Sequence, residues 1–128
     1  MQFSRAIEYA LLGLTYLAQK EAAASTREIA ESERLSPYFL RNVFRKLREA
    51  QLIKPYRGKG YILNQKPGAI SLQTVVEAVE GKVNIHECLE KKRPGCLRSR
   101  NCRIVYTLGV LQKKFITELN RIHLNDLL

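Results

Sequence analysis

The sequence has few acidic residues and no long run of apolar ones. Its 128 residues include 12 Asp and Glu against 22 Lys and Arg, which gives a formal net charge of +10 and a pI near 9.8. Such an excess indicates a polyanionic partner, either nucleic acid or an anionic membrane surface. No stretch reaches the roughly 20 apolar residues of a membrane span. The apolar stretch 9–18 imitates a secretory signal, but Glu8 precedes it and Gly13 and Thr15 interrupt it, so we expect a cytoplasmic protein without a membrane partner.

Groups that carry out catalysis are also scarce. The chain shows no Ser/His/Asp constellation and no glycine-rich loop that would cradle a phosphate, and His123 has no evident catalytic partner. Its length is that of about one domain, and a hydrophobic content of 45% is enough for a core but leaves no room for a separate catalytic domain. We therefore expect a binding protein and not an enzyme.

The apolar pattern predicts helices over the first part of the chain. Residues 3–20 carry a broad apolar stripe, and Ser25-Thr26-Arg27-Glu28 fits a capping box that starts a short second helix. Ser36 suits the N-cap of a third helix, and Pro37 suits its first position, where a missing N–H costs nothing. Apolar residues at 40, 43, 44 and 47 then follow the spacing of one buried helix face.

Strands and two more helices are expected beyond this point. Residues 53–57 and 61–64 read as two short strands joined through glycine-containing residues. A fourth helix over 71–80 is expected to end at Gly81 in a left-handed cap. A last helix runs from 103 to about 122.

This order of elements is that of a winged helix-turn-helix, and it defines the predicted fold class. That class is mainly α: a winged helix-turn-helix domain with a small β-hairpin wing and a long C-terminal dimerisation helix. The predicted division is 1–81 for the DNA-binding domain, 82–102 for a cysteine cluster-binding loop, and 103–128 for the dimerisation helix and tail.

The third helix and the wing concentrate positive charge. Residues 41–66 hold eight Lys and Arg and one acid, Glu49, a local net charge of +7. In a winged helix-turn-helix the second helix of the motif enters the major groove while cations of the wing meet phosphates. The competing interpretation is a solvated basic face that binds nothing. The predicted DNA-binding residues are Arg27, Ser36, Pro37, Tyr38, Arg41, Asn42, Arg45, Lys46, Arg57 and Lys59.

Individual roles follow from side-chain chemistry. Arg41 and Arg45 suit guanine, and Asn42 suits adenine. The hydroxyl of Tyr38 is placed either to donate to a phosphate or, in the alternative, to pack with its ring against the first helix.

The last helix carries an apolar stripe at spacings of 4, 3, 4, 4 and 3. It could pack internally, but a long final helix after a compact domain favours a dimer seam. The predicted dimer contacts are Ile104, Leu108, Leu111, Phe115, Leu119 and Ile122.

Three cysteines, Cys88, Cys96 and Cys102, lie close together in the sequence. An odd number cannot form a closed set of disulfides, and it favours a reducing compartment with metal or redox chemistry. Six basic residues between Lys91 and Arg103 favour the thiolate, and thiolates select zinc or iron–sulfur clusters. Zinc sites usually contain C-x2-C pairs, and none occurs here. Buried structural cysteines fit poorly with so polar a loop, and the spacing alone leaves a cluster and a thiol switch both open.

Several segments together form a joint pattern over nearly the entire chain. They are 1–4 with 8–11, 27–30, 36–40, 47–50, Arg57-Gly58, 76–81, the three cysteines and 123–127. This pattern resembles the family of dimeric bacterial regulators that includes IscR, NsrR and RirA. The resemblance implies a homodimer on a palindromic operator of double-stranded DNA, with an iron–sulfur cluster in each subunit that controls DNA affinity.

The resemblance also implies cluster ligands and a branch. The IscR branch has a histidine three residues after the last cysteine, where this chain has Val105. The NsrR branch uses an acidic residue of the first helix, where Glu8 stands, so the comparison leans to NsrR or RirA. The implied metal ligands are Cys88, Cys96 and Cys102 with Glu8 of the partner subunit, and His86 competes for the fourth place. A 4Fe-4S cluster is favoured over 2Fe-2S.

The function implied is that of a repressor that senses nitric oxide, iron or redox state. One alternative is a cluster-free regulator of the same fold that responds to thiol oxidation or to an effector. Another is an iron–sulfur carrier, against which the basic third helix argues. The wing, Arg57 to Tyr61, is shorter than the glycine-rich tip common in the family.

Overall fold

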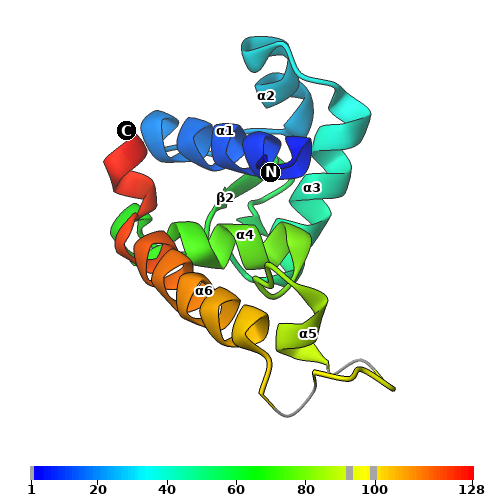
Figure 1. The fold of residues 1–128 in the computed structure, drawn as a ribbon. Helices are drawn as coiled ribbons and strands as arrows, with labels where there is room; N and C mark the ends of the chain where they lie inside the picture. The colour runs from blue at the N-terminus through cyan, green and yellow to red at the C-terminus, as the bar shows by residue number, and fades with distance from the viewer. Residues whose placement is uncertain (1, 92–93, 99–100) are drawn as a thin grey trace.

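The computed structural model describes residues 2–91, 94–98 and 101–128, and it is mainly helical with one two-stranded antiparallel hairpin (Figure 1). The predicted class, a mainly α winged helix-turn-helix fold, is confirmed. The elements in chain order are α1 (Arg5–Lys20), α2 (Thr26–Glu33), α3 (Pro37–Glu49), β1 (Ile53–Pro55), β2 (Tyr61–Leu63), the 3-10 turn η1 (Pro67–Ala69), α4 (Leu72–Glu80), α5 (Glu87–Glu90), α6 (Arg103–Arg121) and the 3-10 turn η2 (Leu124–Leu127).

Serine side chains begin the first four α-helices. The hydroxyls of Ser4, Ser25, Ser36 and Ser71 each accept the backbone N–H of the residue three positions on. Each bond satisfies one of the N–H groups that a helix start leaves without a partner. The predicted N-caps at Ser25 and Ser36 are therefore confirmed, as is Pro37 in the first turn of α3.

The core lies between α1, α3 and α4. The wing, which is the β1–β2 hairpin, and the C-terminal turn η2 close its edges. Gly13 allows α1 to approach α3, because a methyl group at this position would overlap Phe44 Cε1 and lie 2.8 Å from Cζ. The largest fully buried side chains are Phe44, Leu14, Ile29, Leu40, Leu47, Leu52, Ile53, Ile70, Leu124 and Val75.

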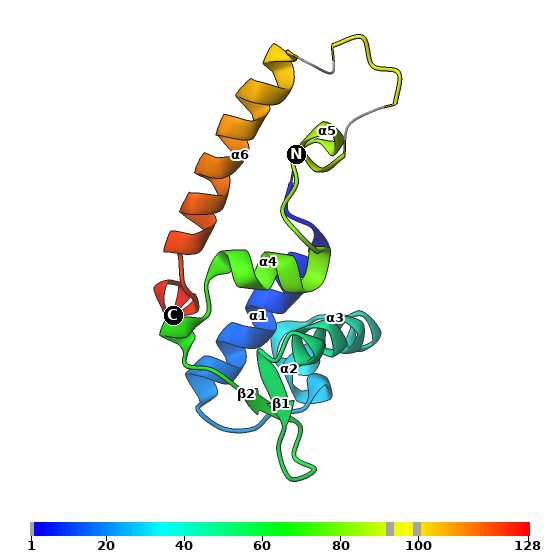
Figure 2. The same cartoon turned by 90° about the horizontal axis from the view of Figure 1, so that it is seen from below.

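The C-terminal end of the chain belongs to this same core. The Leu72 N–H donates to the Ile122 carbonyl at 2.7 Å, and the Leu124 N–H donates to the Ile70 carbonyl at 2.8 Å. Leu119 and Leu124 are both buried. The rest of α6 extends away from the helix-turn-helix unit, and the wing projects at the opposite end of the molecule (Figure 2).

Two predicted details are wrong. The first strand ends at Pro55, short of 57, because the Lys59 N–H closes a turn on the Tyr56 carbonyl at 2.8 Å, and the second strand ends at Leu63, short of 64. Gly81 has a positive φ of 85° but a ψ of −175°, which is not a left-handed helical cap. This region is open essentially to glycine alone, and it turns the chain from α4 into an extended path toward α5.

Candidate nucleic-acid interface and cysteine segment

The N-terminus of α3 is fixed by α1. Tyr9, a buried residue of α1, accepts the Ser36 N–H on its hydroxyl at 3.0 Å. Its ring meets Phe39 edge-on, with the centroids 4.8 Å apart. Because a helix-turn-helix presents the first residues of its recognition helix to base edges, these two contacts set where that end of α3 points.

The two faces of α3 divide as the sequence predicts. Leu40, Val43, Phe44 and Leu47 are buried against α1 and α4. The opposite face carries the predicted base-reading residues, and we call it the basic face of α3. Its members are Tyr38, Arg41, Asn42, Arg45 and Arg48, all exposed except the half-buried Asn42.

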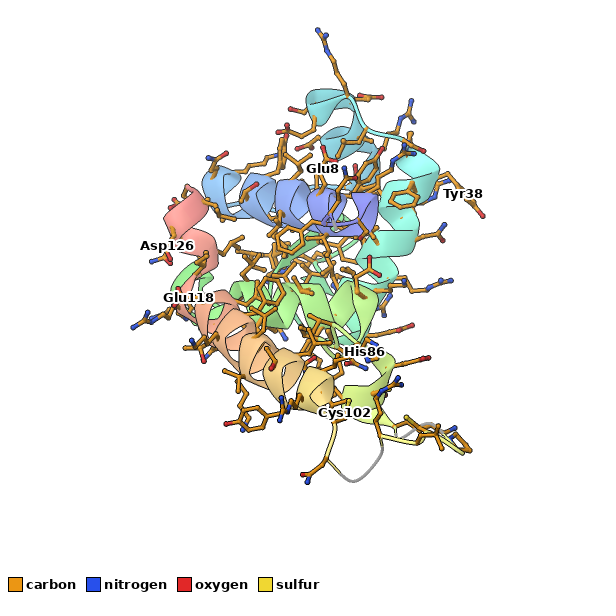
Figure 3. All side chains as sticks on the ribbon, in the orientation of Figure 1. Glu8, Tyr38, His86, Cys102, Glu118 and Asp126 are labelled. Carbon is orange, nitrogen blue, oxygen red and sulfur yellow. The ribbon has the colours of Figure 1, made fainter. Side chains whose placement is uncertain are left out.

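Tyr38 does not pack against α1. Its side chain points away from the molecule (Figure 3) and is 70% exposed. The guanidinium of Arg41, one turn further along α3, lies over the Tyr38 ring at 5.9 Å from the centroid. The ring is therefore available at the surface next to a cation.

Other predicted DNA-binding residues have contacts inside the fold. The Lys46 ammonium donates to the Val79 carbonyl at the end of α4, at 3.1 Å. Arg27 forms an exposed ion pair with Glu31 at 3.4 Å, one turn along α2. Ser36 caps α3. A contact of these residues with DNA would be made in addition to, or at the cost of, these interactions.

The wing is anchored through its second strand. The Tyr61 N–H donates to the Ala24 carbonyl at 2.8 Å, and the Ala24 N–H donates to the Tyr61 carbonyl at 3.1 Å. Gly60, with a φ of 104°, makes this approach possible, because a Cβ there would overlap the Ala24 oxygen. The Tyr61 ring also meets Phe44 of α3 edge-on at 5.5 Å. Sequence reasoning missed this anchor, and Gly60 was the only available signal.

The wing tip carries the two predicted phosphate contacts. Ile53 of β1 pairs with Leu63 of β2, and Pro55 pairs with Tyr61, so the turn begins directly after Pro55. Arg57 and Lys59 are both exposed in this turn, as the sequence predicts for residues that meet DNA.

A charged cluster holds α2 on α1. The Glu28 carboxylate accepts hydrogen bonds from the Tyr16 hydroxyl, at 2.9 Å, and from the Lys20 ammonium. A capping box would direct this carboxylate back to Ser25, so the predicted box forms only through its serine. The two donors hold the pKa of Glu28 below its ordinary value, and the carboxylate raises the pKa of Tyr16 and Lys20.

The cysteines lie in the segment between α5 and α6. Cys88 is in α5, Cys96 follows in the loop, and Cys102 is the N-cap residue of α6; all three are free and half-buried. Among the described residues, no three His, Cys, Asp or Glu side chains are placed to hold a metal ion together. Three of the six cations expected near the thiols, Lys92, Arg93 and Arg100, lie outside the described residues.

The two candidates for a fourth ligand differ in position. Glu8 is exposed on α1, on the other side of the molecule from Cys102 (Figure 3). Within one subunit it is therefore not brought to the cysteines. His86 caps α5, because its Nδ1 accepts the Cys88 N–H at 3.1 Å. This bond uses the Nδ1 lone pair and leaves the ring proton of a neutral imidazole on Nε2, so His86 is engaged as a cap.

The predicted stripe on α6 is covered only in part. Leu119 is 3% exposed, and Leu108 and Phe115 are half-buried. Ile104 and Leu111 are 60% and 53% exposed. The remaining stripe residue, Ile122, is exposed as well, as are Tyr106 and Val110 outside the stripe. Leu119, and in part Leu108 and Phe115, thus pack within the subunit, whereas Ile104, Leu111 and Ile122 face solvent.

The start of α6 is connected to the end of α4 through α5. The Ile85 N–H donates to the Gln112 side-chain oxygen at 2.8 Å, and Leu89 packs against Gly109 of α6. The chain therefore passes from α4 to the cysteines along the side of α6. In the described part of the chain, no helix is both long and apolar enough to cross a membrane.

Comparison with known proteins identifies relatives with this arrangement. CymR of Bacillus subtilis, an HTH-type transcriptional regulator, is 34% identical over 98 residues, which cover 73% of this chain and 71% of the relative. NsrR of Shouchella clausii, also an HTH-type transcriptional regulator, is 27% identical over 131 residues, or 99% of this chain and 88% of the relative.

The solved structure of CymR, described as the global cysteine regulator of B. subtilis, superposes with a TM-score of 0.80 at 28% identity. The match covers 99% of this chain and 95% of that one. The family model for Rrf2, described as an iron-dependent transcriptional regulator, matches residues 3–128. These relatives are regulators, so the expectation of a regulator and not an enzyme is confirmed. The chain belongs to the Rrf2 family of transcriptional regulators.

Proposed function

We propose that the chain is a cytoplasmic, homodimeric repressor whose affinity for a palindromic operator is controlled by an iron–sulfur cluster. The observation that carries the DNA-binding part is the basic face of α3, exposed on a helix whose N-terminus is held by Tyr9. Arg41, Asn42 and Arg45 would read bases in the major groove. Arg57 and Lys59 of the wing would contact the flanking backbone.

The dimer is proposed to form through the solvent-facing part of α6. Ile104 and Leu111, separated by two turns of helix, are both exposed there. Pairing these faces in two subunits would remove apolar surface from water. It would also place two α3 helices for half-sites about one DNA turn apart.

The cysteine segment supplies donors of the right chemistry for a cluster. Cys88, Cys96 and Cys102 are free thiols, and soft thiolates are the usual ligands of iron–sulfur clusters. These three residues would hold the cluster together with Glu8 of the partner subunit, and closure of the segment would have to bring the thiols together. When bound, the cluster would supply iron that reacts with nitric oxide or oxygen or is lost under iron limitation.

The proposed ligands belong to two different parts of the molecule. Glu8 lies on α1, which positions α3 through Tyr9, whereas Cys102 begins the dimer helix α6. Ligation by both would connect the DNA-binding unit of one subunit to α6 of the other. Loss of the cluster would release that connection and shift the population between dimers that fit the operator and dimers that do not.

A thiol-based regulator without a cluster is the second candidate. It is favoured by the structural similarity to CymR, which covers 99% of this chain, because CymR is described as a global cysteine regulator. The separation of potential ligands among the described residues also favours it. In that case the cysteines would change state by oxidation, or an effector would bind, and the same α5–α6 segment would respond.

Anaerobic purification separates the two candidates. Iron and sulfide analysis with absorption and Mössbauer spectroscopy should show a cluster in the wild type and its loss in each Cys→Ala variant. Glu8→Ala should retain the cluster with an altered spectrum or lifetime. If only Glu8→Ala is silent, the cluster stands and His86 or a small molecule becomes the preferred fourth ligand. A wild-type protein without iron that changes operator affinity on thiol oxidation would instead establish the second candidate. Wild-type colour in all three Cys→Ala variants would show that the cluster site is wrong.

DNA binding and dimerisation are tested separately from the cluster. Against a duplex selected by this protein from a random pool, Arg41→Ala with Arg45→Ala should remove about 1–3 kcal/mol per base contact. A normal footprint of this double variant would refute the assignment of α3. Ile104→Glu with Leu111→Glu should give monomers, whereas Phe115 is left unchanged because it packs against the core. A double variant that still sediments as a dimer would refute the α6 interface.

A further inference from the structure

The wing tip holds an arginine over an aromatic ring. The guanidinium of Arg57 lies 5.3 Å from the centroid of the Tyr56 ring. Both residues are at the surface, although Tyr56 is only 36% exposed. A cation within about 6 Å of a ring centroid is attracted by the ring's quadrupole. The stack therefore restricts a side chain that would otherwise sample many rotamers.

The ring is carried by a rigid part of the turn. The Tyr56 N–H donates to the Gly60 carbonyl at 2.9 Å, and the Tyr56 carbonyl accepts the Lys59 N–H at 2.8 Å. Gly60 is in turn pressed against the loop between α1 and α2. The platform under Arg57 is therefore fixed to the body of the domain, and the stack places the guanidinium relative to α3.

The backbone of Arg57 is unfavourable for an arginine. Its φ is 46°, and that of the next residue, Gly58, is 71°. Two successive positive φ values define the tight hairpin turn for which Asn-Gly and Gly-Gly are strongly preferred. Glycine stands at 58 and 60, where φ is also positive, but arginine stands at 57. Glu21, Arg34 and Gln51 share a positive φ, so the backbone of Arg57 is compatible with a role for its side chain, and the stack on Tyr56 is what argues for that role.

We propose that Tyr56 is a positioning residue, whose ring holds the guanidinium of Arg57 ready for contact with duplex DNA flanking the major-groove site. The proposal rests on the DNA-binding function proposed above and adds a residue that the sequence did not single out. The pair of Arg41 and Tyr38 on α3 has the same chemistry at 5.9 Å. Both DNA-facing elements thus present an arginine held by a neighbouring tyrosine. An ordered arginine loses less rotational freedom on binding than a free one, which raises affinity without adding a contact.

The affinity of four variants for the selected duplex, measured with the full chain, tests this role. Tyr56→Phe keeps the ring and should bind within about twofold of the wild type. Tyr56→Leu should bind about two- to fivefold more weakly, the factor that corresponds to an exposed cation–π pair. Arg57→Ala should bind more weakly still. The double variant Tyr56→Leu, Arg57→Ala should match Arg57→Ala, because the ring has nothing left to position.

The dependence of affinity on salt distinguishes positioning from charge. Arg57→Ala should reduce the slope of log affinity against log salt by about 0.9 if the contact is a phosphate. Tyr56→Leu should leave this slope unchanged, because the bound complex keeps the same cation. A tyrosine with a merely structural role would give the same loss whether Arg57 is present or has been replaced by alanine. Wild-type affinity of Tyr56→Leu, or an equal loss in Tyr56→Phe, would also overturn the proposal.

Two further measurements keep the test decisive. In the free protein, the ring current of residue 56 should shift Arg57 side-chain protons upfield in the wild type and in Tyr56→Phe but not in Tyr56→Leu. If Tyr56→Leu fails to fold, Arg57→Lys replaces it, since this change keeps the charge and removes the planar guanidinium. We then expect a two- to fivefold loss of affinity with an unchanged salt slope, and wild-type affinity would refute the proposal. Wild-type affinity and slope in Arg57→Ala would instead show that the wing does not contact DNA, which is a failure of the proposed function itself.

Discussion

Replacement of Gly13 by alanine should destabilise the protein although the change lies inside a helix. In an ordinary helix interior, Gly→Ala stabilises by up to about 1 kcal/mol. Here the added methyl group would overlap Phe44 Cε1 and lie 2.8 Å from Cζ. Phe44 has no exposed surface and meets Tyr61 edge-on at 5.5 Å, so its ring can move only if α1, α3 or the wing moves.

The expected magnitude follows from these opposing terms. Overpacking of a core costs about 1–3 kcal/mol, and the gain in helix propensity offsets part of it. We therefore expect a net loss of about 1–2 kcal/mol in the free energy of unfolding. For a domain of this size that loss lowers Tm by about 4–8 °C, measured at equal protein concentration. Operator affinity should also fall, because α1 sets the position of α3.

Urea unfolding followed by circular dichroism measures the change, and Gly109→Ala in α6 is the matched control. Among the residues that the structure describes, a Cβ at Gly109 meets only Leu89, at an ordinary 3.5 Å, so this variant should be stabilised. Phe44→Leu removes the clashing ring carbons, so Gly13→Ala in that background should become neutral or stabilising. If Gly13→Ala is as stable as Gly109→Ala, or if its cost is unchanged in the Phe44→Leu background, the packing argument is refuted.

Three other perturbations test the wing, the C-terminal turn and the α1–α2 contact. Gly60→Ala should lower the free energy of urea unfolding by about 2–3 kcal/mol, because it would break the two backbone hydrogen bonds between Ala24 and Tyr61, of about 1 kcal/mol each, and strain a φ of 104°. An unchanged urea midpoint would contradict the anchoring of the wing at Ala24. Leu124→Ala should cost about 2–5 kcal/mol as a core cavity, whereas a cost near zero would place the C-terminal turn outside the core. Lys20 lowers the pKa of Glu28, so the ionised carboxylate stabilises the fold at any pH above its ordinary pKa, and this stabilisation is lost as pH falls through the lowered pKa. The pKa of Lys20 is raised, so the stabilisation by its ammonium is lost only as pH rises through that raised pKa. The Tm difference between wild type and Glu28→Gln should accordingly be constant at neutral pH and vanish in acid, and a difference that persists in acid would rule this cause out.

Sequence reasoning about local structure was reliable where the interaction spans few residues. Ser25 and Ser36 cap helices because a serine hydroxyl reaches the N–H three residues on, whatever surrounds it. The apolar face of α3 follows in the same way from helical periodicity. The cap at Gly81 was predicted with the wrong ψ, because that angle depends on where α5 lies relative to α4.

The candidate sites show the same division. The residue types of the basic face and the three cysteines are visible in the sequence, and the structure finds that face exposed. Lys46 has the charge expected of a DNA contact, but its ammonium donates a hydrogen bond to the carbonyl at the end of α4. His86 has the imidazole expected of a metal ligand, but that ring caps α5. A side chain's chemistry defines what it can bind, and only its neighbours decide which of these partners it meets.

By itself the sequence determined the helix starts, the buried face and the basic face of α3, and the presence of a hairpin. Each of these arises from groups within a few residues of one another. Only the tertiary structure decided that Leu119 is covered within the subunit while Leu111 is left to solvent. Periodicity defines an apolar face but not the surface that covers it. The close approaches of Gly13 to Phe44 and of Gly60 to Ala24 likewise join segments far apart in the chain, and they exist only once the helices have packed.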